Sequence, residues 1–342
     1  MNLYFGDLHN HTGYSDGRGR PEQALAQMRE RGLDFAALTD HAESLNIPLI
    51  TRRNYPNIAT PFSCPPPPGL TEWEDTLRQA TLATQDGFLA LRGFEFSSSV
   101  QGHVNVWFSK DYVDAMTLGE EDLTPFWRWL ATAEPGMAEP LAGFNHPGVQ
   151  PRTFDHLAFR PEAAERLVTL EIFNRDDDYF PFYLRALDNG WRLGAIGVSD
   201  HHRWDWGSPQ LAVAGVYAEA LTAEGLREAL VARRVYATRE RGLHLALCLD
   251  GVEMGGQLRA PASAELRLEV DVEAAPRGSD LARVEVYSSG GSLVAAQPIS
   301  GRRARSVFAL PAPASGERWY VVKLLSSDRH IATASAIWVQ AE

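Results

Sequence analysis

Residues 6–17, close to the start of the chain, read GDLHNHTGYSDG. This stretch follows a short apolar run and places Asp7, His9, His11 and Asp16 within ten residues. One interpretation is a polar loop that happens to contain histidines. The other is a metal-binding strand end, because residues two apart on a strand point to one face, so that His9 and His11 can bind one ion. The rest of the sequence has to decide between the two.

Size and charge restrict the class of protein. With 342 residues the chain is long enough for one large domain and a smaller one. A net charge of -12 disfavours stable binding to nucleic acid, although a local group of cations could still bind a small phosphate ester. The two cysteines are far apart, and no signal peptide or long apolar run is visible. We therefore expect a cytoplasmic protein that does not associate with membranes.

The first 240 residues alternate short apolar runs with helical patterns, which is typical of βα units and a largely parallel sheet. The clearest helix spans residues 21–31, with a proline in its first turn and a glycine just after its end. Residues 46–70 include SCPPPPG, which excludes regular structure, and we interpret them as an insert or lid beside the site. Strands are expected at residues 3–8, 34–38, 88–94, 103–108, 141–144, 168–173, 192–198 and 211–217.

The pattern changes in residues 241–342. Segments such as AELRLEVDVEA and RWYVVKLLSS alternate apolar and polar residues at period two, with turn residues between them. This predicts a small all-β sandwich domain of about 100 residues. The sandwich is either a buttress for the first domain or a binding unit for carbohydrate or protein. As a buttress it could also mediate contacts between two copies of the chain, so a homo-oligomer is an alternative to a monomer.

Metal-ligand residue types follow one expected strand after another. Seven of the ten histidines lie in these motifs. In a barrel of parallel strands, functional residues collect at the C-terminal ends, so positions far apart in sequence can meet at one mouth. Mixed imidazole and carboxylate ligands suit zinc, manganese or iron better than calcium or magnesium. The residues after His9 and His11 in this series are His41, Glu95, His103, His146, Asp200 and His202.

Read in order, these motifs resemble a known family. DLHNHTGYSDG, TDH, a lone glutamate after a strand, GHVN, NHP and SDHH are similar to the PHP (polymerase and histidinol phosphatase) family of metal-dependent hydrolases over roughly residues 1–240. GHVNV and the trailing sandwich are more similar to the carbaryl-hydrolase-type branch than to compact histidinol phosphatases. The resemblance implies a distorted (β/α)7 TIM-like barrel that binds two or three divalent ions of zinc, manganese or iron.

The resemblance also implies a set of ligands. The first ion would be held by His9, His11, Glu95 and Asp200. Glu95 would bridge to a second ion held by His103 and His146. Asp16, His41 and His202 would hold a third ion, with Asp16 in the place of a histidine found in part of the family. Glu95, Asp200 and His202 are the expected catalytic residues.

Five further residues have competing interpretations. Asp7 and Asp40 lie beside expected ligands, where they either orient imidazole rings from behind or cap loops. His201 should point away from the metals by strand alternation, which favours a packing or supporting role over ligation. Arg152 and Arg175 follow strand ends, and each either contacts a substrate anion or is an ordinary solvated arginine.

The function implied is hydrolysis by a hydroxide that bridges two metal ions. The commonest activity implied by the family is cleavage of a small-molecule phosphate mono- or diester. The branch resemblance implies an alternative, a carboxylic ester, carbamate or amide hydrolase with the same site, and the third alternative is a non-catalytic metal-binding module. Cations at the mouth of the site would favour the phosphate ester, whereas an aromatic, uncharged pocket would favour the alternative.

Overall fold

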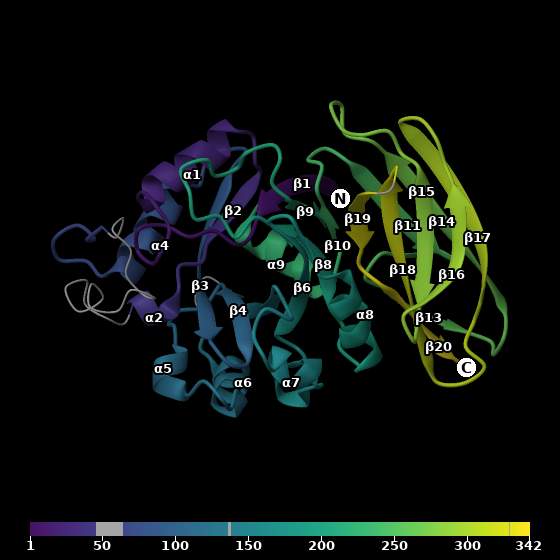
Figure 1. The fold of residues 1–342 in the computed structure, drawn as a ribbon, viewed down its shortest axis with the longest axis horizontal. Coiled ribbons are helices and arrows are strands. Elements are labelled where there is room, and N and C mark those ends of the chain that lie inside the picture. The colour runs from purple at the N-terminus through teal and green to yellow at the C-terminus, as the bar shows by residue number, and fades with distance from the viewer. Residues whose placement is uncertain (46–63, 136–137, 328) are drawn as a thin grey trace.

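The computed structural model describes residues 1–45, 64–135, 138–327 and 329–342. The chain forms two adjoining parts, a mixed α/β part that contains the N-terminus and a β-rich part that contains the C-terminus (Figure 1). Of the expected lid, residues 46–63 lie outside the described residues, and residues 64–70 are coil and turn. None of the described helices has the length and apolar character needed to cross a bilayer.

The α/β part contains all eight expected strands, with ends that differ by up to four residues from those predicted. A very short strand, β7, and a strand that leads into the C-terminal part, β10, were not expected. The strands are β1 (Asn2–Asp7), β2 (Phe35–Leu38), β3 (Leu89–Ser98), β4 (Gly102–Trp107), β5 (Leu141–Asn145), β6 (Leu167–Asn174), β7 (Asp177–Asp178), β8 (Gly194–Val198), β9 (Val213–Ala218) and β10 (Val235–Thr238).

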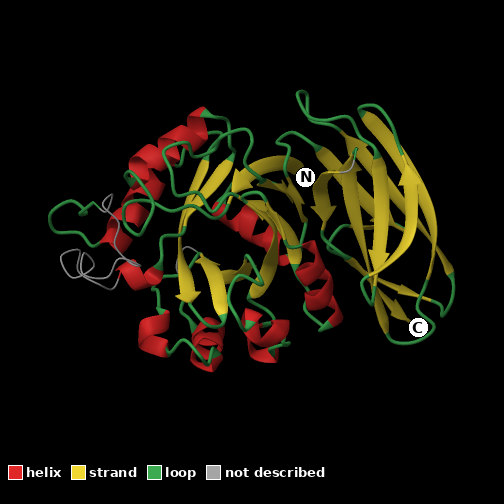
Figure 2. Cartoon of the chain, viewed as in Figure 1, coloured by secondary structure: helices red, strands yellow, loops and turns green. Residues whose placement is uncertain are grey.

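Helices cover the outside of this sheet (Figure 2). The expected first helix is confirmed: it starts at Pro21, buries Ala24, Leu25 and Met28 on one face, and is followed by Gly32 at a φ of 80°, which favours glycine. The helices are α1 (Pro21–Glu30), α2 (Ala42–Leu45), α4 (Glu72–Ala83), α5 (Ala115–Leu118), α6 (Thr124–Thr132), α7 (Thr153–Leu157), η1 (Pro161–Ala163), α8 (Phe180–Asp188) and α9 (Ala223–Val231).

The sheet is mixed and open, which corrects the expectation of a (β/α)7 TIM-like barrel with largely parallel strands. β1, β2 and β3 pair in parallel, and so do β5, β6 and β8. β4, however, is antiparallel to both β3 and β5, and β9 is antiparallel to both β1 and β10. The three residues between β3 and β4 are too few for the crossover that parallel pairing needs. Among the described strands no ladder joins β8 to β9 or β10, so the sheet does not close.

The C-terminal part is rich in antiparallel strands, as the period-two pattern predicts. One separate sheet has the order β12-β11-β14-β17, and buried and exposed residues alternate along β14. The other strands continue the sheet of the first part, because β19 pairs antiparallel with β10. A hydrogen-bonded ladder thus joins strands on both sides of the expected boundary at residue 240. The division of the chain into two domains at this residue stays a prediction. The strands are β11 (His244–Leu249), β12 (Val252–Glu253), β13 (Gln257–Ala260), β14 (Glu265–Glu273), β15 (Arg283–Ser288), β16 (Ser292–Pro298), β17 (Arg303–Pro311), β18 (Glu317–Ser326), β19 (Arg329–Ala334) and β20 (Ile337–Ala341).

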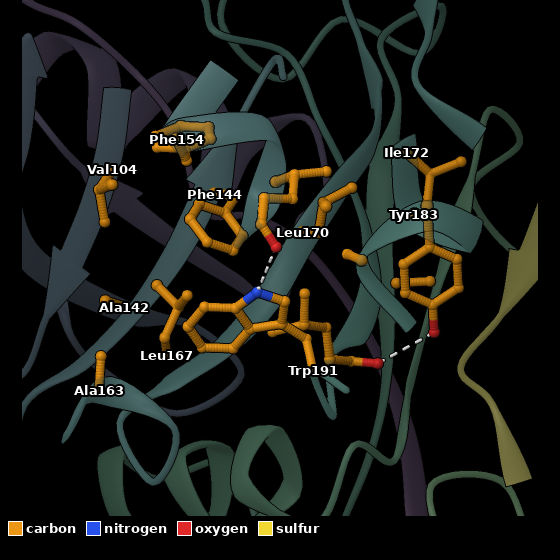
Figure 3. Close-up of a cluster of buried hydrophobic side chains, with 14 of the residues drawn as sticks. Val104, Ala142, Phe144, Phe154, Ala163, Leu167, Leu170, Ile172, Tyr183 and Trp191 are labelled. Atoms are coloured by element: carbon orange, nitrogen blue, oxygen red, sulfur yellow. Dashed lines mark hydrogen bonds between the residues drawn. The ribbon is translucent and has the colours of Figure 1, made fainter. Parts of the chain in front are cut away.

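A core of aromatic and aliphatic side chains lies between β5, β6 and α8 (Figure 3). Trp191 is 1% exposed, and its indole N–H donates to the carbonyl oxygen of Leu157 at 3.0 Å. The Tyr183 hydroxyl donates to the carbonyl oxygen of Leu193 at 2.9 Å. Because both buried polar groups have partners, these rings contribute apolar burial without an unsatisfied donor. The core thereby fixes the strands whose ends form the site.

Candidate metal centre

The ligand-type side chains collect at one edge of the mixed sheet, where the parallel strands have their C-terminal ends. His103 reaches the same edge from the opposite direction: it begins the antiparallel strand β4, and its register partners are Ser97 on β3 and Asn145 on β5. The structure brings all nine expected ligand residues into one cluster, namely His9, His11, Asp16, His41, Glu95, His103, His146, Asp200 and His202.

Glu95 lies at the centre of this cluster and is 1% exposed. Burial by itself would raise the pKa of this carboxyl group, but the surrounding imidazoles outweigh burial and hold its pKa well below the usual value. The group is therefore an ionised carboxylate. Its Oε1 lies 3.2 Å from Nδ1 of His103, 3.3 Å from Nε2 of His9 and 3.4 Å from Nε2 of His146, and its Oε2 lies 2.7 Å from Nδ1 of His41.

Two aspartates complete the negative charge on either side of Glu95. Asp200 Oδ1 lies 3.3 Å from Nε2 of His11 and 3.5 Å from Nε2 of His9. Asp16 Oδ1 lies 3.0 Å from Nε2 of His202 and 3.5 Å from Nε2 of His41. Burial opposes ionisation of both aspartates, yet the nearby imidazoles lower both pKa values, so both groups carry a charge.

The donor set fits divalent metal ions. Asp16 Oδ1 is buried and, among the described residues, makes no hydrogen bond of acceptable geometry despite its three histidine neighbours. The Nε2 atoms of His9 and His11 lie only 3.1 Å apart, which brings two ring nitrogens to the same point. The described residues form three groups of candidate ligands, and within each group the ligand atoms lie within 4.8 Å of one another. The groups are His11, Asp16, His41 and His202; His9, His11 and Glu95; and His41, Glu95 and His103. Such mixed nitrogen and oxygen clusters are consistent with a multinuclear divalent metal site.

Glu171 on β6 is a site residue that the sequence reasoning missed. It is fully buried, and its Oε1 accepts a hydrogen bond from Nδ1 of His9 at 2.7 Å. Its Oε2 accepts from the backbone N–H of His146 and from Nδ2 of Asn174, each at 2.8 Å. Because a carboxylate can only accept here, Nδ1 of His9 carries the proton and Nε2 is free to act as a ligand. The signal in the sequence was one acidic residue within the apolar strand LVTLEIFN.

Asp7 is buried, but it supports the backbone and not an imidazole. It accepts hydrogen bonds from the Ser199 hydroxyl and from the backbone N–H groups of Ser199 and His9. Burial raises the pKa of Asp7 to about 6, and the hydrogen bond from Ser199 opposes that rise. Asp7 thus ties the end of β1 to the end of β8, the two strand ends that carry His9 and Asp200.

Asp40 and His201 also lie beside the cluster. Asp40 accepts a hydrogen bond from the Ser15 hydroxyl at 2.6 Å, and Ser15 Oγ lies 3.2 Å from Nδ1 of His11, so that Asp40 reaches the imidazole through Ser15. The ring of His201 is turned toward Asp205, with Nε2 2.8 Å from Oδ1, and it belongs to none of the three ligand groups formed by the described residues. The side chain thus lies away from the cluster, but His201 follows the end of β8 at Val198 and the left-handed Asp200, so strand alternation is not the cause.

A cavity of about 360 Å³ opens over the cluster, and a second cavity of about 570 Å³ adjoins it. Arg175 lines both cavities, with Nη2 3.0 Å from Asp200 Oδ2 and 3.1 Å from Nδ1 of His202. Arg152 lines neither and instead donates to the carbonyl oxygen of Glu121. The chain turns away after Arg152 into the left-handed turn Thr153–Leu157, which removes this arginine from the site.

Three site residues have backbone conformations that non-glycine residues seldom adopt. His146, Arg175 and Asp200 follow or end strands at φ values of 26°, 52° and 48°. Left-handed φ values cost free energy for residues with a Cβ and tend to occur where function requires a particular side-chain direction. At these strand ends the chain reverses direction, and all three side chains line the first cavity.

Comparison with known proteins is consistent with this geometry. A family model of the PHP domain matches residues 7–118, about a third of the chain. No curated protein matches the chain. The structure of a two-domain protein of Bacteroides vulgatus, described as containing a PHP-like metal-dependent phosphoesterase, is 15% identical, has a TM-score of 0.52 and covers 98% of this chain and 95% of that one. A candidate metal-dependent phosphoesterase of Bifidobacterium adolescentis is 15% identical, with a TM-score of 0.34 and coverage of 66% and 95%.

Residues 7–118 are similar to the PHP domain, and the clustered ligands are those of a metal-dependent enzyme. The likeness to the Bacteroides vulgatus structure extends over both parts of the chain and shows a shared two-part fold. The similarity to the carbaryl-hydrolase-type branch and the identity of the metal stay predictions.

Proposed function

We propose that this protein hydrolyses phosphate mono- or diesters of small molecules. The observation that carries the proposal is that Arg175, a cation suited to phosphate oxygens, lines the same cavity as seven of the expected metal ligands. Tyr179 is the single aromatic ring, histidines apart, among the described residues that line this cavity. A charged wall of this kind supports a phosphate ester over an uncharged carboxylic ester, carbamate or amide. The phosphoesterase description of the Bacteroides vulgatus protein points in the same direction.

The ions would be held as the motifs imply, by Glu95 together with the imidazoles and aspartates of the cluster. When bound, divalent ions supply Lewis acidity, which activates water near neutral pH and offsets negative charge on a phosphoryl group. Glu171 and Asp40 orient His9 and His11 from behind, Asp40 by way of the Ser15 hydroxyl. The ligand geometry is therefore held by the protein itself.

Arg175 and Tyr179 are placed to bind the substrate. The guanidinium of Arg175 is 57% exposed and faces the cavity, where its planar N–H groups can bind two oxygens of a phosphate. Burial raises the pKa of the Tyr179 hydroxyl, and the nearby Asp177 raises it further, so that Tyr179 stays protonated. A neutral hydroxyl on this wall can donate a hydrogen bond to the leaving-group oxygen without adding charge.

The test is a set of initial rates with p-nitrophenyl phosphate, bis-p-nitrophenyl phosphate, p-nitrophenyl acetate and a p-nitrophenyl carbamate, each with Mn²⁺ or Zn²⁺ and with an EDTA control. Metal-dependent turnover of the phosphates is the expected result. Arg175→Ala should lower kcat/KM for them by roughly 10- to 100-fold. Arg152→Ala is the matched control, because this arginine lines neither cavity, and it should leave the rates unchanged.

Two other results would redirect the assignment. Turnover of the acetate or carbamate alone would replace the proposal with the ester and carbamate hydrolase alternative. No turnover of any of the four substrates by protein with confirmed bound metal would instead favour the metal-binding module.

A further inference from the structure

We propose that the C-terminal part of the chain positions the substrate-binding loop of the site, with Arg239 and His330 as the positioning residues. The loop, residues 174–179, joins β6 to α8 and is called here the site loop. Four of its residues, Asn174, Arg175, Asp177 and Tyr179, line the cavity over the metal cluster. The role of the loop in substrate binding rests on the proposed function, whereas its attachment to the C-terminal part does not.

Arg239 fixes the backbone of the site loop at three consecutive residues. Its Nη1 donates to the carbonyl oxygen of Arg175 at 3.1 Å, and its Nη2 donates to those of Asp176 at 3.0 Å and Asp177 at 2.8 Å. The same guanidinium lies 4.2 Å from the centre of the Phe173 ring, in a cation–π contact. Five donors in a rigid plane allow one arginine to hold several carbonyls at once, which lysine could not do.

Arg239 is itself held by the C-terminal strands. It follows β10, which pairs with β19, and its backbone N–H donates to the carbonyl oxygen of Ile331 on β19 at 2.9 Å. The hydrogen bonds therefore run from β19 to Arg239 and from Arg239 to the site loop. In Figure 1, β19 lies beside β10 where the C-terminal part meets the α/β part.

His330 makes a second attachment directly from β19. This buried imidazole lies with Nδ1 2.7 Å from Oδ2 of Asp178, and its Nε2 lies 2.7 Å from Oγ1 of Thr333. Oδ1 of Asp178 accepts from the backbone N–H of Phe180, which starts α8. The ring also packs edge-on against Phe180. Asp178 is thereby fixed by the C-terminal part at one oxygen and caps α8 with the other.

These attachments add to the support that the segment has of its own, which is the two-residue pairing of β7 with the end of β6. Arg175 has a left-handed backbone at a φ of 52°, a conformation that a free loop would leave. Its side chain is more than half exposed, and the guanidinium is held on the cavity side by Asp200 and His202, so the contacts from the C-terminal part act on the backbone of the loop. Arg239 forms hydrogen bonds with individual carbonyl groups of the loop and does not merely cover its surface. These contacts favour the buttress interpretation of the C-terminal part over a separate binding unit.

The experiment uses the full-length protein and four variants. Arg239→Ala and His330→Ala remove the two attachments, while His330→Asn keeps a side-chain N–H close to the position of Nδ1. Arg303→Ala on β17 is the matched control, because this C-terminal arginine is 77% exposed and pairs only with Glu273 among the described residues. Hydrogen exchange of peptides covering residues 174–180 is measured together with metal content and with KM and kcat for bis-p-nitrophenyl phosphate.

Both alanine variants should exchange the amides of residues 174–180 at least about tenfold faster than wild type, with unchanged metal content. KM should rise roughly five- to tenfold with a smaller change in kcat, because the loop binds substrate and holds no metal ligand. His330→Asn and Arg303→Ala should behave like wild type.

Unchanged exchange in residues 174–180 in both alanine variants would overturn the proposal. Equally faster exchange over the whole chain would also overturn it, since that would indicate a general loss of stability. Failure of wild type to hydrolyse any phosphate would count against the proposed function alone, because the exchange data would still report on the loop.

Discussion

Replacing Glu171 by glutamine tests whether the buried carboxylate behind His9 prepares the site for metal. Glutamine has nearly the same shape, but it carries one acceptor oxygen and an NH₂ group in place of two acceptors. The wild-type carboxylate accepts from three donors, namely Nδ1 of His9, the backbone N–H of His146 and Nδ2 of Asn174. In Glu171→Gln the amide oxygen keeps the most donors when it faces His146 and Asn174, which places the NH₂ against Nδ1 of His9, so that His9 loses its partner or changes its tautomer. The opposite orientation keeps the bond to His9 and leaves the donors of His146 and Asn174 facing the NH₂.

The size of the effect follows from these contacts. Carboxylate partners of metal-binding histidines typically contribute about 10- to 100-fold in metal affinity, which is roughly 1.4–2.8 kcal/mol. Two imidazole-bearing segments depend on Glu171, since it holds the ring of His9 and the backbone of His146. We therefore expect a loss near the upper end of this range. Competition of the apoprotein with a Zn²⁺ chelator measures the affinity directly.

The matched control is Glu285→Gln. Glu285 is also buried, but it lies on β15 in the C-terminal part and accepts a hydrogen bond from the Tyr287 hydroxyl. It should leave zinc affinity unchanged. An affinity of Glu171→Gln within about twofold of wild type, in a protein that is still folded, would refute the reasoning that the tautomer of His9 is set by this carboxylate.

Three further outcomes are expected. Glu95→Ala should remove at least about 99% of the phosphate turnover, because this carboxylate contacts five imidazoles at the centre of the cluster, and near-normal rates would contradict its central role. Removal of metal with EDTA should lower the thermal midpoint, since an ion at about 1,000 times its Kd stabilises by roughly 4 kcal/mol; an unchanged midpoint would contradict the metal site. Burial lowers the pKa of His330 against the opposing effect of Asp178, so the folded state disfavours the charged ring and stability falls as the pH drops below about 6.5. His330→Asn should therefore lose less unfolding free energy than wild type between about pH 7.5 and 5.5 in urea titrations, and equal losses would exclude this contribution.

The local elements and the residue types at the site could be predicted from the amino-acid sequence. The proline at position 21 and the glycine at position 32 set the limits of α1, and eight strands followed from apolar runs, because these signals act within a few residues. The ligand candidates were recognisable because histidine, aspartate and glutamate recur at successive strand ends.

The pairing of these strands could not be predicted from the sequence and is seen in the folded chain. The antiparallel direction of β4, which brings His103 to the ligand edge, and the open sheet depend on which strands are neighbours, and period-two patterns do not specify neighbours. Glu171 could not be assigned from sequence because its partner His9 is 162 residues away. Arg152 and Arg175 read alike in the sequence, yet one faces the cavity and the other does not. The contacts of Arg239 with the site loop are equally non-local, because they arise where β10 meets β19, and long-range pairing is a property of the folded chain and not of any segment.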